Sequence, residues 1–151
     1  MCSTANEIRQ KLEHLADAER AVKAQRYFKT GEGDYAEGDI FIGITTPVIR
    51  SLVKEHQFMK ISELLQLLHS PIHEERMFAL LVLVTQFEKG TENDKENIYQ
   101  LFITNTQWIN NWDLVDVTIP KVVGPILLKE IKQYFTHWRN HQYSGKKELQ
   151  S

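Results

Sequence analysis

The feature that most constrains this chain is an apolar run set between two helix-boundary signals. Residues 77–87 read MFALLVLVTQF, and apolar side chains point in nearly every direction around a helix of this sequence. Such a helix is stable only when other elements surround it. Ser70-Pro71 precedes the run as a capping residue followed by proline, and Gly90 ends it. The pattern predicts a core built around one central helix over about 72–89.

Apolar residues at helical spacing predict further helices on both sides of this segment. Thr46-Pro47 is a second start signal, with Thr46 as N-cap, and Thr91 with Asp94 forms a capping-box pattern. The other expected helices cover 5–29, the segment from Thr46, 61–69 and about 92–105. Short connections and the absence of period-2 alternation predict an all-α fold of antiparallel helix pairs, stacked as a helical-repeat solenoid. We expect this domain to span 1–135 and to be followed by a flexible tail over 136–151.

Length and composition exclude several classes of protein. With 151 residues the chain has the size of one domain. Its single cysteine, Cys2, has no partner for a disulfide, and nothing marks it as a nucleophile. The N-terminus lacks the basic and apolar regions of a signal peptide, and no segment is apolar enough to span a membrane. We therefore expect a cytoplasmic protein without a membrane partner.

Charge is distributed unevenly along the chain. Residues 1–128 hold 13 Lys/Arg and 18 Asp/Glu, whereas residues 129–151 hold 5 and 2. The whole chain, at a net charge of −2, is not the strongly basic protein expected of many nucleic-acid binders. A basic stripe does step by three along the first helix, and it is either a solvated face or a row of DNA phosphate contacts: Arg20, Lys23, Arg26 and Lys29.

The loop over 30–46 and the histidine pairs carry weak functional signals. Gly31-x-Gly33 lacks the rest of a phosphate-binding pattern, so we interpret the loop as structural, with Phe41, Ile42 and Ile44 in the core. His137 and His141 have the spacing of two zinc ligands, but no third ligand is evident, and His69 and His73 are separated by a helix break. We expect neither a metal nor a cofactor.

The stretch QWINNWDLVD, residues 107–116, is the strongest candidate for a site. Asn110 or Asn111 is placed to cap a helix from Trp112, and Asp113 then lies in its first turn, where the helix dipole stabilises a carboxylate. Asp116 is one helical turn from Trp112 and shares its face. Pro120 removes the N–H that would bond the carbonyl of Asp116, so the helix is expected to bend or loosen there.

Three segments of the chain resemble the DNA alkylation repair glycosylases, which are built from HEAT-like helical repeats. The segments are RYFKTGEGDYAEGDIFIGITTPVIRSL (26–52), SPIHEERMFALLVLV (70–84) and INNWDLVD (109–116). They occur in the family's order and with its spacing, and the resemblance runs from about residue 20 to Gly124.

The resemblance implies excision of cationic N3- and N7-alkylated purines from duplex DNA. Within the WDLVD motif, Asp116 takes the role of the carboxylate that stabilises charge developing on the sugar, and Trp112 that of the aromatic surface against the lesion. Asn111 stands where relatives have a second aromatic residue, so it is a further candidate for substrate binding.

The likeness fades after Gly124, where relatives continue through more repeats. Trp138-Arg139 does not match the later tryptophan and arginine of the family in spacing, so it receives no role. The chain is therefore expected to be incomplete, to excise poorly by itself and to self-associate through its C-terminal helix. The alternative is a non-catalytic helical-repeat module that binds DNA or a protein partner.

Overall fold

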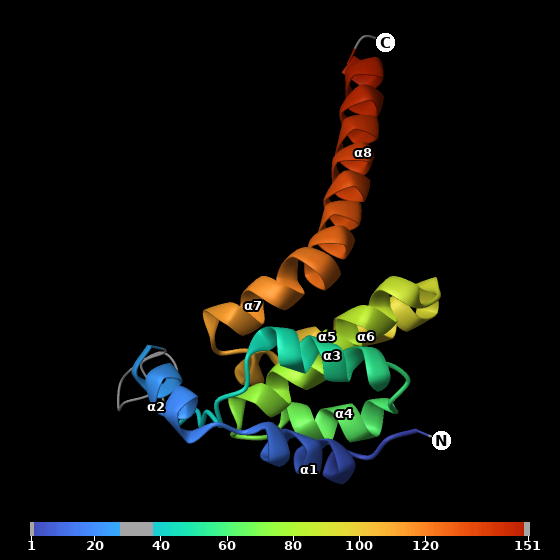
Figure 1. Cartoon of the computed structure of the whole chain (residues 1–151). Coiled ribbons are helices and arrows are strands. Elements are labelled where there is room, and N and C mark those ends of the chain that lie inside the picture. The colour runs from blue at the N-terminus through green and yellow to red at the C-terminus, as the bar shows by residue number, and fades with distance from the viewer. Residues whose placement is uncertain (1, 28–37, 150–151) are drawn as a thin grey trace.

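The structure is a computed structural model, which describes residues 2–27 and 38–149 (Figure 1). The described residues are all-α, as predicted, and form no strand; one isolated β-bridge joins Ile40 to Ile72. The helices are α1 (Ala5–Leu15), α2 (Ala18–Tyr27), α3 (Thr46–Glu55), α4 (Ile61–Leu68), α5 (His73–Lys89), α6 (Glu92–Thr104), α7 (Trp112–Thr118) and α8 (Gly124–Leu149). A 3₁₀ turn, η1 (Thr106–Trp108), precedes α7, and a π-helical turn, η2 (Ile119–Val123), follows it.

Helix α5 lies at the centre of the fold, as its apolar sequence predicts. Every residue from His73 to Val84 is buried, and the helix contacts α1, α3, α4, α6, α7 and η2. Figure 1 shows α3 and α4 stacked near α5, with α1 beneath α4. The connections that lead from α4 into α5 and from α5 into α6 are short, so consecutive helices run antiparallel, as in a helical-repeat fold.

Three helix starts test the capping predictions. The box formed by Thr91 and Asp94 at the start of α6 is confirmed, with both reciprocal hydrogen bonds present. The N-cap of α3 is Thr45, so the assignment of Thr46 was one residue late. The assignment of Ser70 as a cap was wrong, because α5 begins only at His73 and its N-cap is Ile72. The Ser70 hydroxyl instead donates to Glu75 at 2.7 Å and accepts from the N–H of Ile72 at 3.0 Å.

The single helix predicted over 5–29 is divided into α1 and α2. Ala16 adopts an extended conformation, and Asp17 then caps α2 by accepting a hydrogen bond from the N–H of Arg20 at 3.0 Å. The N–H of Asp17 is itself bonded to the carbonyl of Ile42 at 2.8 Å, which draws the chain out of the helical path. An aspartate followed by the acidic first turn of α2 was a local start signal that helical periodicity alone concealed.

The irregularity predicted at Pro120 is confirmed. The N–H of Gly124 donates to the carbonyl of Ile119, which is a five-residue π-type bond, and the segment 119–123 forms the π turn η2. Since Pro120 has no N–H to offer, the chain passes from α7 into α8 through this wider turn. Helix α8 extends away from the packed helices in Figure 1 and is continuous to Leu149, so the domain boundary placed at 135 falls within a helix. Within the described residues, no helix is both long and apolar enough to cross a membrane.

The loop that enters α3 is held against α5 by one buried carboxylate. Glu74 accepts hydrogen bonds from the N–H groups of Ile42, Gly43 and Ile44 at 2.7 to 3.2 Å. This arrangement buries Phe41 and packs Ile42 and Ile44 against the core, as expected. Gly43 has φ +84°, and a Cβ at this position would meet the carbonyl oxygen of Asp17 at 2.0 Å. Only glycine therefore fits where the loop passes between α5 and the start of α2. Gly31 and Gly33 lie outside the described residues.

We predict that Gly43→Ala destabilises the fold by more than about 2 kcal/mol, because it adds both backbone strain and a steric clash. Gly38→Ala is the matched control. Gly38 has φ +82° but nothing within 4 Å of a new Cβ, so it carries the strain alone, about 1 kcal/mol. Equilibrium unfolding in urea measures both values. Equal losses in the two variants would show that the close approach at Asp17 is unimportant.

Candidate functional site

Helices α3, α5 and α7 line one groove and run in the same direction along it. Residues near the N-terminal ends of the three helices, among them Ile49, His73 and Asp113, line a cavity of about 380 Å³. Residues farther along the same helices, among them Val53 and Asp116, line a second cavity of about 320 Å³. We call these the N-terminal and C-terminal cavities of the groove.

Asp116 lies in the C-terminal cavity among three basic side chains. Arg50 and Lys54 come from one face of α3, and Lys121 comes from η2. Asp116 is exposed, and its carboxylate forms no hydrogen bond or ion pair with the described part of the chain. The three cations can bind the phosphates of a ligand. The unpaired carboxylate among them can interact with a positively charged centre of the same ligand.

A second acidic residue, Glu88, shares this cavity with the basic side chains. Lys121 lies 3.6 Å from Glu88 of α5, and both side chains are about half exposed. An ion pair this exposed contributes little to stability, so a phosphate can displace it at small cost. Arg50 and Lys54 have no ion-pair partner among the described residues. The cavity therefore offers three cations for an anionic backbone.

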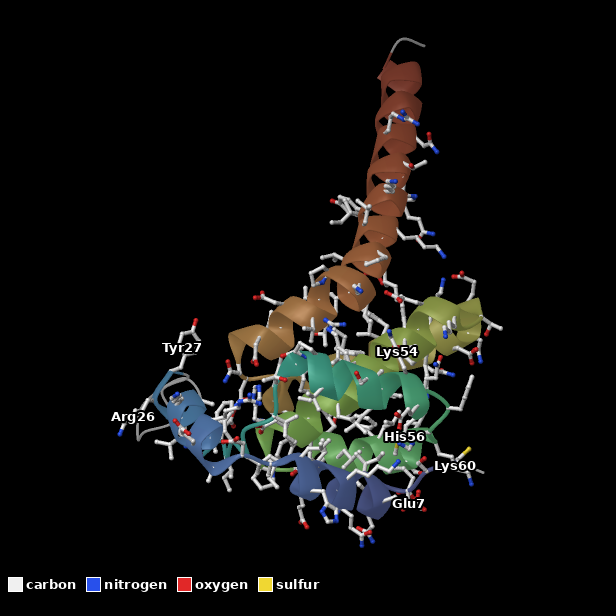
Figure 2. The ribbon with its side chains drawn as sticks, in the orientation of Figure 1. Glu7, Arg26, Tyr27, Lys54, His56 and Lys60 are labelled. Carbon is white, nitrogen blue, oxygen red and sulfur yellow. The ribbon has the colours of Figure 1, made fainter. Side chains whose placement is uncertain are left out.

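The predicted basic stripe is only partly near the groove. Arg20 and Lys23 of α2 line the N-terminal cavity, where Lys23 also lies 3.5 Å from the exposed Glu19. Arg26 is at the outer end of α2, beside Tyr27 and far from Lys54 (Figure 2). Lys29 lies outside the described residues. Two members of the stripe are thus placed to contact a ligand that extends along the groove from Asp116.

A buried polar network supports the floor of the groove. The Nε2 atom of His73 lies 2.6 Å from a carboxylate oxygen of Asp113, and a guanidinium nitrogen of Arg76 lies 2.6 Å from Asp39. Arg76 also donates to the carbonyl of Trp108 at 3.2 Å and to the side chain of Asn110 at 3.0 Å. These bonds join the first turn of α5 to the loop at Asp39 and to the segment that leads into α7.

The network shifts two pKa values in opposite directions. Burial lowers the pKa of His73, but its hydrogen bond with Asp113 and the nearby carboxylate of Asp39 outweigh this effect and raise the pKa above the ordinary value of 6.5. Burial likewise raises the pKa of Asp39, and the interactions with His73 and Arg76 reverse this and lower it below 3.8. Both groups therefore favour their charged forms inside the protein.

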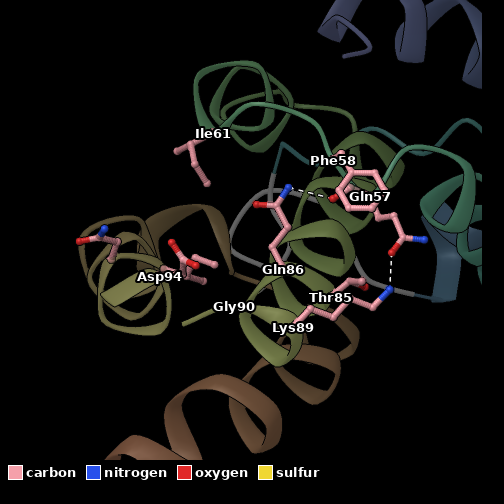
Figure 3. Close-up of a pocket in the computed structure, with 10 residues that line it drawn as sticks. Gln57, Phe58, Ile61, Thr85, Gln86, Lys89, Gly90 and Asp94 are labelled. Atoms are coloured by element: carbon pink, nitrogen blue, oxygen red, sulfur yellow. Dashed lines mark hydrogen bonds between the residues drawn. The ribbon is translucent and has the colours of Figure 1, made fainter. Parts of the chain in front are cut away.

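Another hollow, of about 340 Å³, also lies near the C-terminal end of α5, and few of its polar groups are available to a ligand (Figure 3). Its polar groups already bond to one another. Gln86 donates to the carbonyls of Gln57 and Met59 at 3.0 and 2.9 Å, and Lys89 is hydrogen-bonded to the side chain of Gln57. Asp94, also in its wall, is engaged in the cap of α6. The groove that contains Asp116 is thus the better candidate site.

Comparison with protein families gave a match over most of the chain. A family model described as DNA alkylation repair enzyme matches residues 8–144, which is nearly the whole chain. The chain belongs to the DNA alkylation repair enzyme family. A search of curated proteins and a search of solved structures found no match.

The WDLVD segment, residues 112–116, lies within α7. Its N-cap is Asn111, one of the two predicted candidates. The Asn111 side chain is 1% exposed, makes no capping bond and has no hydrogen-bond partner among the described residues. Asp113 is in the first turn, also as predicted. Trp112 opens the helix, and its side chain is not among those the structure describes. The other tryptophan of the stretch, Trp108, packs on the core and stacks on His69 at 5.2 Å, so it holds the fold together.

In this member of the DNA alkylation repair enzyme family, sequence reasoning missed the cations around Asp116. Arg50 and Lys54 are four residues apart within the range that the family model matches, and this spacing was an available sign of a basic helix face. Lys121 directly follows Pro120 and carried no local signal. No cluster of three or more potential metal ligands occurs among the described residues.

We predict that the stability of the protein falls as pH rises through the folded-state pKa of His73. The pKa of His73 is higher in the folded state than in the unfolded state, where it is 6.5. The stabilisation from protonated His73 is therefore fully present below pH 6.5 and is lost above the folded-state pKa. The charged groups around His73 are Asp113 of α7, Asp39 of the loop and Arg76 of α5, with Arg20 and Lys23 across the cavity. Asp39 acts oppositely, since its contribution is lost only as pH falls through its lowered pKa.

The test is urea unfolding at several pH values above 6.5, with a slope of at most about 1.4 kcal/mol per pH unit for one proton. His73→Gln removes the titrating group and should flatten the profile there. A His73→Gln profile as steep as that of the natural protein would assign the effect to another group.

Proposed function

We propose that the chain is a DNA glycosylase of the alkylpurine type, which excises cationic N3- and N7-alkylated purines. The proposal rests on one observation, which is an unpaired Asp116 carboxylate in a groove bordered by Arg50, Lys54 and Lys121. The cations can bind the phosphates of duplex DNA, and the carboxylate can stabilise the positive charge that develops on the sugar during excision. Membership of a DNA alkylation repair family supports the same reading and makes DNA the expected partner.

Excision of a cationic base requires few groups beyond the Asp116 carboxylate and the cations that hold the DNA. When the bond between sugar and alkylated base breaks, its electron pair goes to the base and neutralises the positive charge there. Positive charge then develops on the sugar, and a fixed carboxylate nearby stabilises it. Water adds to the sugar carbon and gives up a proton to the carboxylate or to solvent. Because the leaving base is already cationic, no strong general acid is needed.

We predict that Asp116→Asn lowers excision by roughly 10²–10³, the range typical of losing one preorganised stabilising group. The measurement is release of N7-methylguanine from methylated duplex DNA. Stability should change little, because the side chain is exposed and unpaired. Asp113→Asn gives the comparison at the neighbouring carboxylate, which is bonded to His73 and not free in the cavity. It should lower the melting temperature, since it weakens the bond to the buried His73. Excision that depends on Asp113 and survives without Asp116 would refute the assignment.

Lys54→Gln is predicted to weaken DNA binding and to reduce its salt dependence. Loss of one phosphate contact lowers the log–log slope of affinity against salt by about 0.9. Lys60→Gln is the matched control, because Lys60 is a lysine at the start of α4, outside the groove (Figure 2). Fluorescence anisotropy with a labelled duplex at several salt concentrations gives both slopes. Removal of charge from Arg20 and Lys23 tests the N-terminal cavity in the same way.

These two experiments also separate the alternative function. A chain that binds duplex DNA through Arg50, Lys54 and Lys121 but releases no alkylated base is a non-catalytic DNA-binding module. Release that rises when further helical repeats of a relative are supplied would support the expectation that this chain is a poor glycosylase by itself.

We also propose self-association through α8. Leu127, Leu128, Ile131 and Tyr134 are 42 to 67% exposed within about two turns of this helix. Residues 129–151 carry a net charge of +3, and residues 1–128 carry −5, so the helix of one copy suits the body of another. Light scattering should give a mass above 17.7 kDa, and Ile131→Lys should return it to that of a monomer. A monomer in the natural chain would contradict the proposal.

A further inference from the structure

Helix α7 has little of its own to fix its direction. It has only 7 residues, its N-cap side chain makes no capping bond, and its C-terminal end passes into the π turn η2. A helix this short is unstable in isolation, so contacts with the rest of the fold must set its position. Asp116 lies in the second turn of α7, and its place in the groove follows from those contacts.

The polar contact that α7 makes is with one residue of α5. Asp113, in the first turn of α7, meets the Nε2 atom of His73 at 2.6 Å. The apolar contacts are made by Leu114, which is fully buried, and by Val117, which packs against the core. Asp113 and Asp116 are three residues apart and line adjoining cavities of the groove, so a bond that holds Asp113 also sets the rotation of α7 that presents Asp116.

His73 is itself held in one orientation. Its side chain is 4% exposed and its ring stacks on Phe41 at a centroid distance of 4.5 Å. Its Nδ1 atom lies 3.8 Å from Asp39, which is tied to Arg76. The neighbouring Glu74 fixes the loop that carries Phe41. Because the His73 side chain is restrained on each side, its hydrogen bond to Asp113 fixes the position of α7 relative to α5.

We propose that His73 is a positioning residue for the candidate site. Its bond to Asp113 orients α7 and so places the Asp116 carboxylate in the groove. The proposal rests on the proposed function for its consequence in excision, but the orientation of α7 is a property of the fold and has its own measurement. On this account His73 never touches DNA, and it acts only through α7.

The fold supplies a matched control in the same turn of α5. Glu75 is as deeply buried as His73, but it bonds Arg9 of α1 at 2.6 Å and Ser70 at 2.7 Å, and neither belongs to α7. Loss of either buried group destabilises the protein. Only loss of His73 should affect α7 more than the other helices.

The first readout is hydrogen exchange at the amides of Val115 and Ile119, which bond within α7. In His73→Leu these amides should exchange at least tenfold faster relative to amides of α4 and α5 in the same variant. In Glu75→Leu that ratio should stay as in the natural chain. His73→Gln should restore much of the protection, because a glutamine amide can still donate to Asp113.

The second readout is excision kinetics at a temperature where all variants are folded. His73→Leu should lower kcat by 10- to 100-fold with little change in KM, and His73→Gln should recover most of it. Unchanged exchange in α7 of His73→Leu, or an equal change in Glu75→Leu, would overturn the proposal. If the natural chain releases no base, the proposed function fails, and the exchange comparison still decides whether His73 positions α7.

Discussion

The fold depends on four charged or polar side chains buried in the first turn of α5. His73, Glu74, Glu75 and Arg76 are at most 3% exposed, and each bonds a different part of the chain. His73 reaches α7, Glu74 the loop before α3, Glu75 helix α1, and Arg76 the loop at Asp39 and the segment before α7. Burial of a charge is unfavourable without a partner, and removal of one partner from such a pair typically destabilises a protein by about 3–5 kcal/mol. Packing arrangements that leave any of the four unpaired are therefore disfavoured.

This arrangement also explains why the groove exists. The apolar remainder of α5 packs beneath α3 and α7, while its polar first turn fixes where those helices begin. Helices α3, α5 and α7 begin at the same end of the groove and run in the same direction. Residues farther along each helix therefore line one cavity. For this reason Asp116 lies in the same cavity as Arg50 and Lys54, although these two residues come more than 60 positions earlier in the sequence.

The electrostatics of the groove fit a reaction on a cationic base in an anionic polymer. A protein with a net charge of −2 binds DNA only where its cations are concentrated, and the C-terminal cavity concentrates three of them around one carboxylate. Asp116 forms no ion pair with these cations or with any other described residue. In the function that we propose, the carboxylate stabilises positive charge and the three cations hold phosphate.

The sequence by itself determined the helical elements and the motif. Periodicity identified the buried α5, the Thr91 and Asp94 box fixed the start of α6, and Pro120 located the π turn, because all three act through hydrogen bonds or spacing within a few residues. The WDLVD segment likewise carried the family resemblance. Tertiary structure reinforced the break of the helix over 5–29 at Ala16, since the bond from Asp17 to Ile42 joins distant segments, although Asp17 also carried a local start signal for α2. It also decided which partners the four polar residues of α5 take and that Lys121 joins Arg50 and Lys54 near Asp116. Such pairings depend on how the helices pack against one another. A local pattern of residues does not encode which distant residues come into contact.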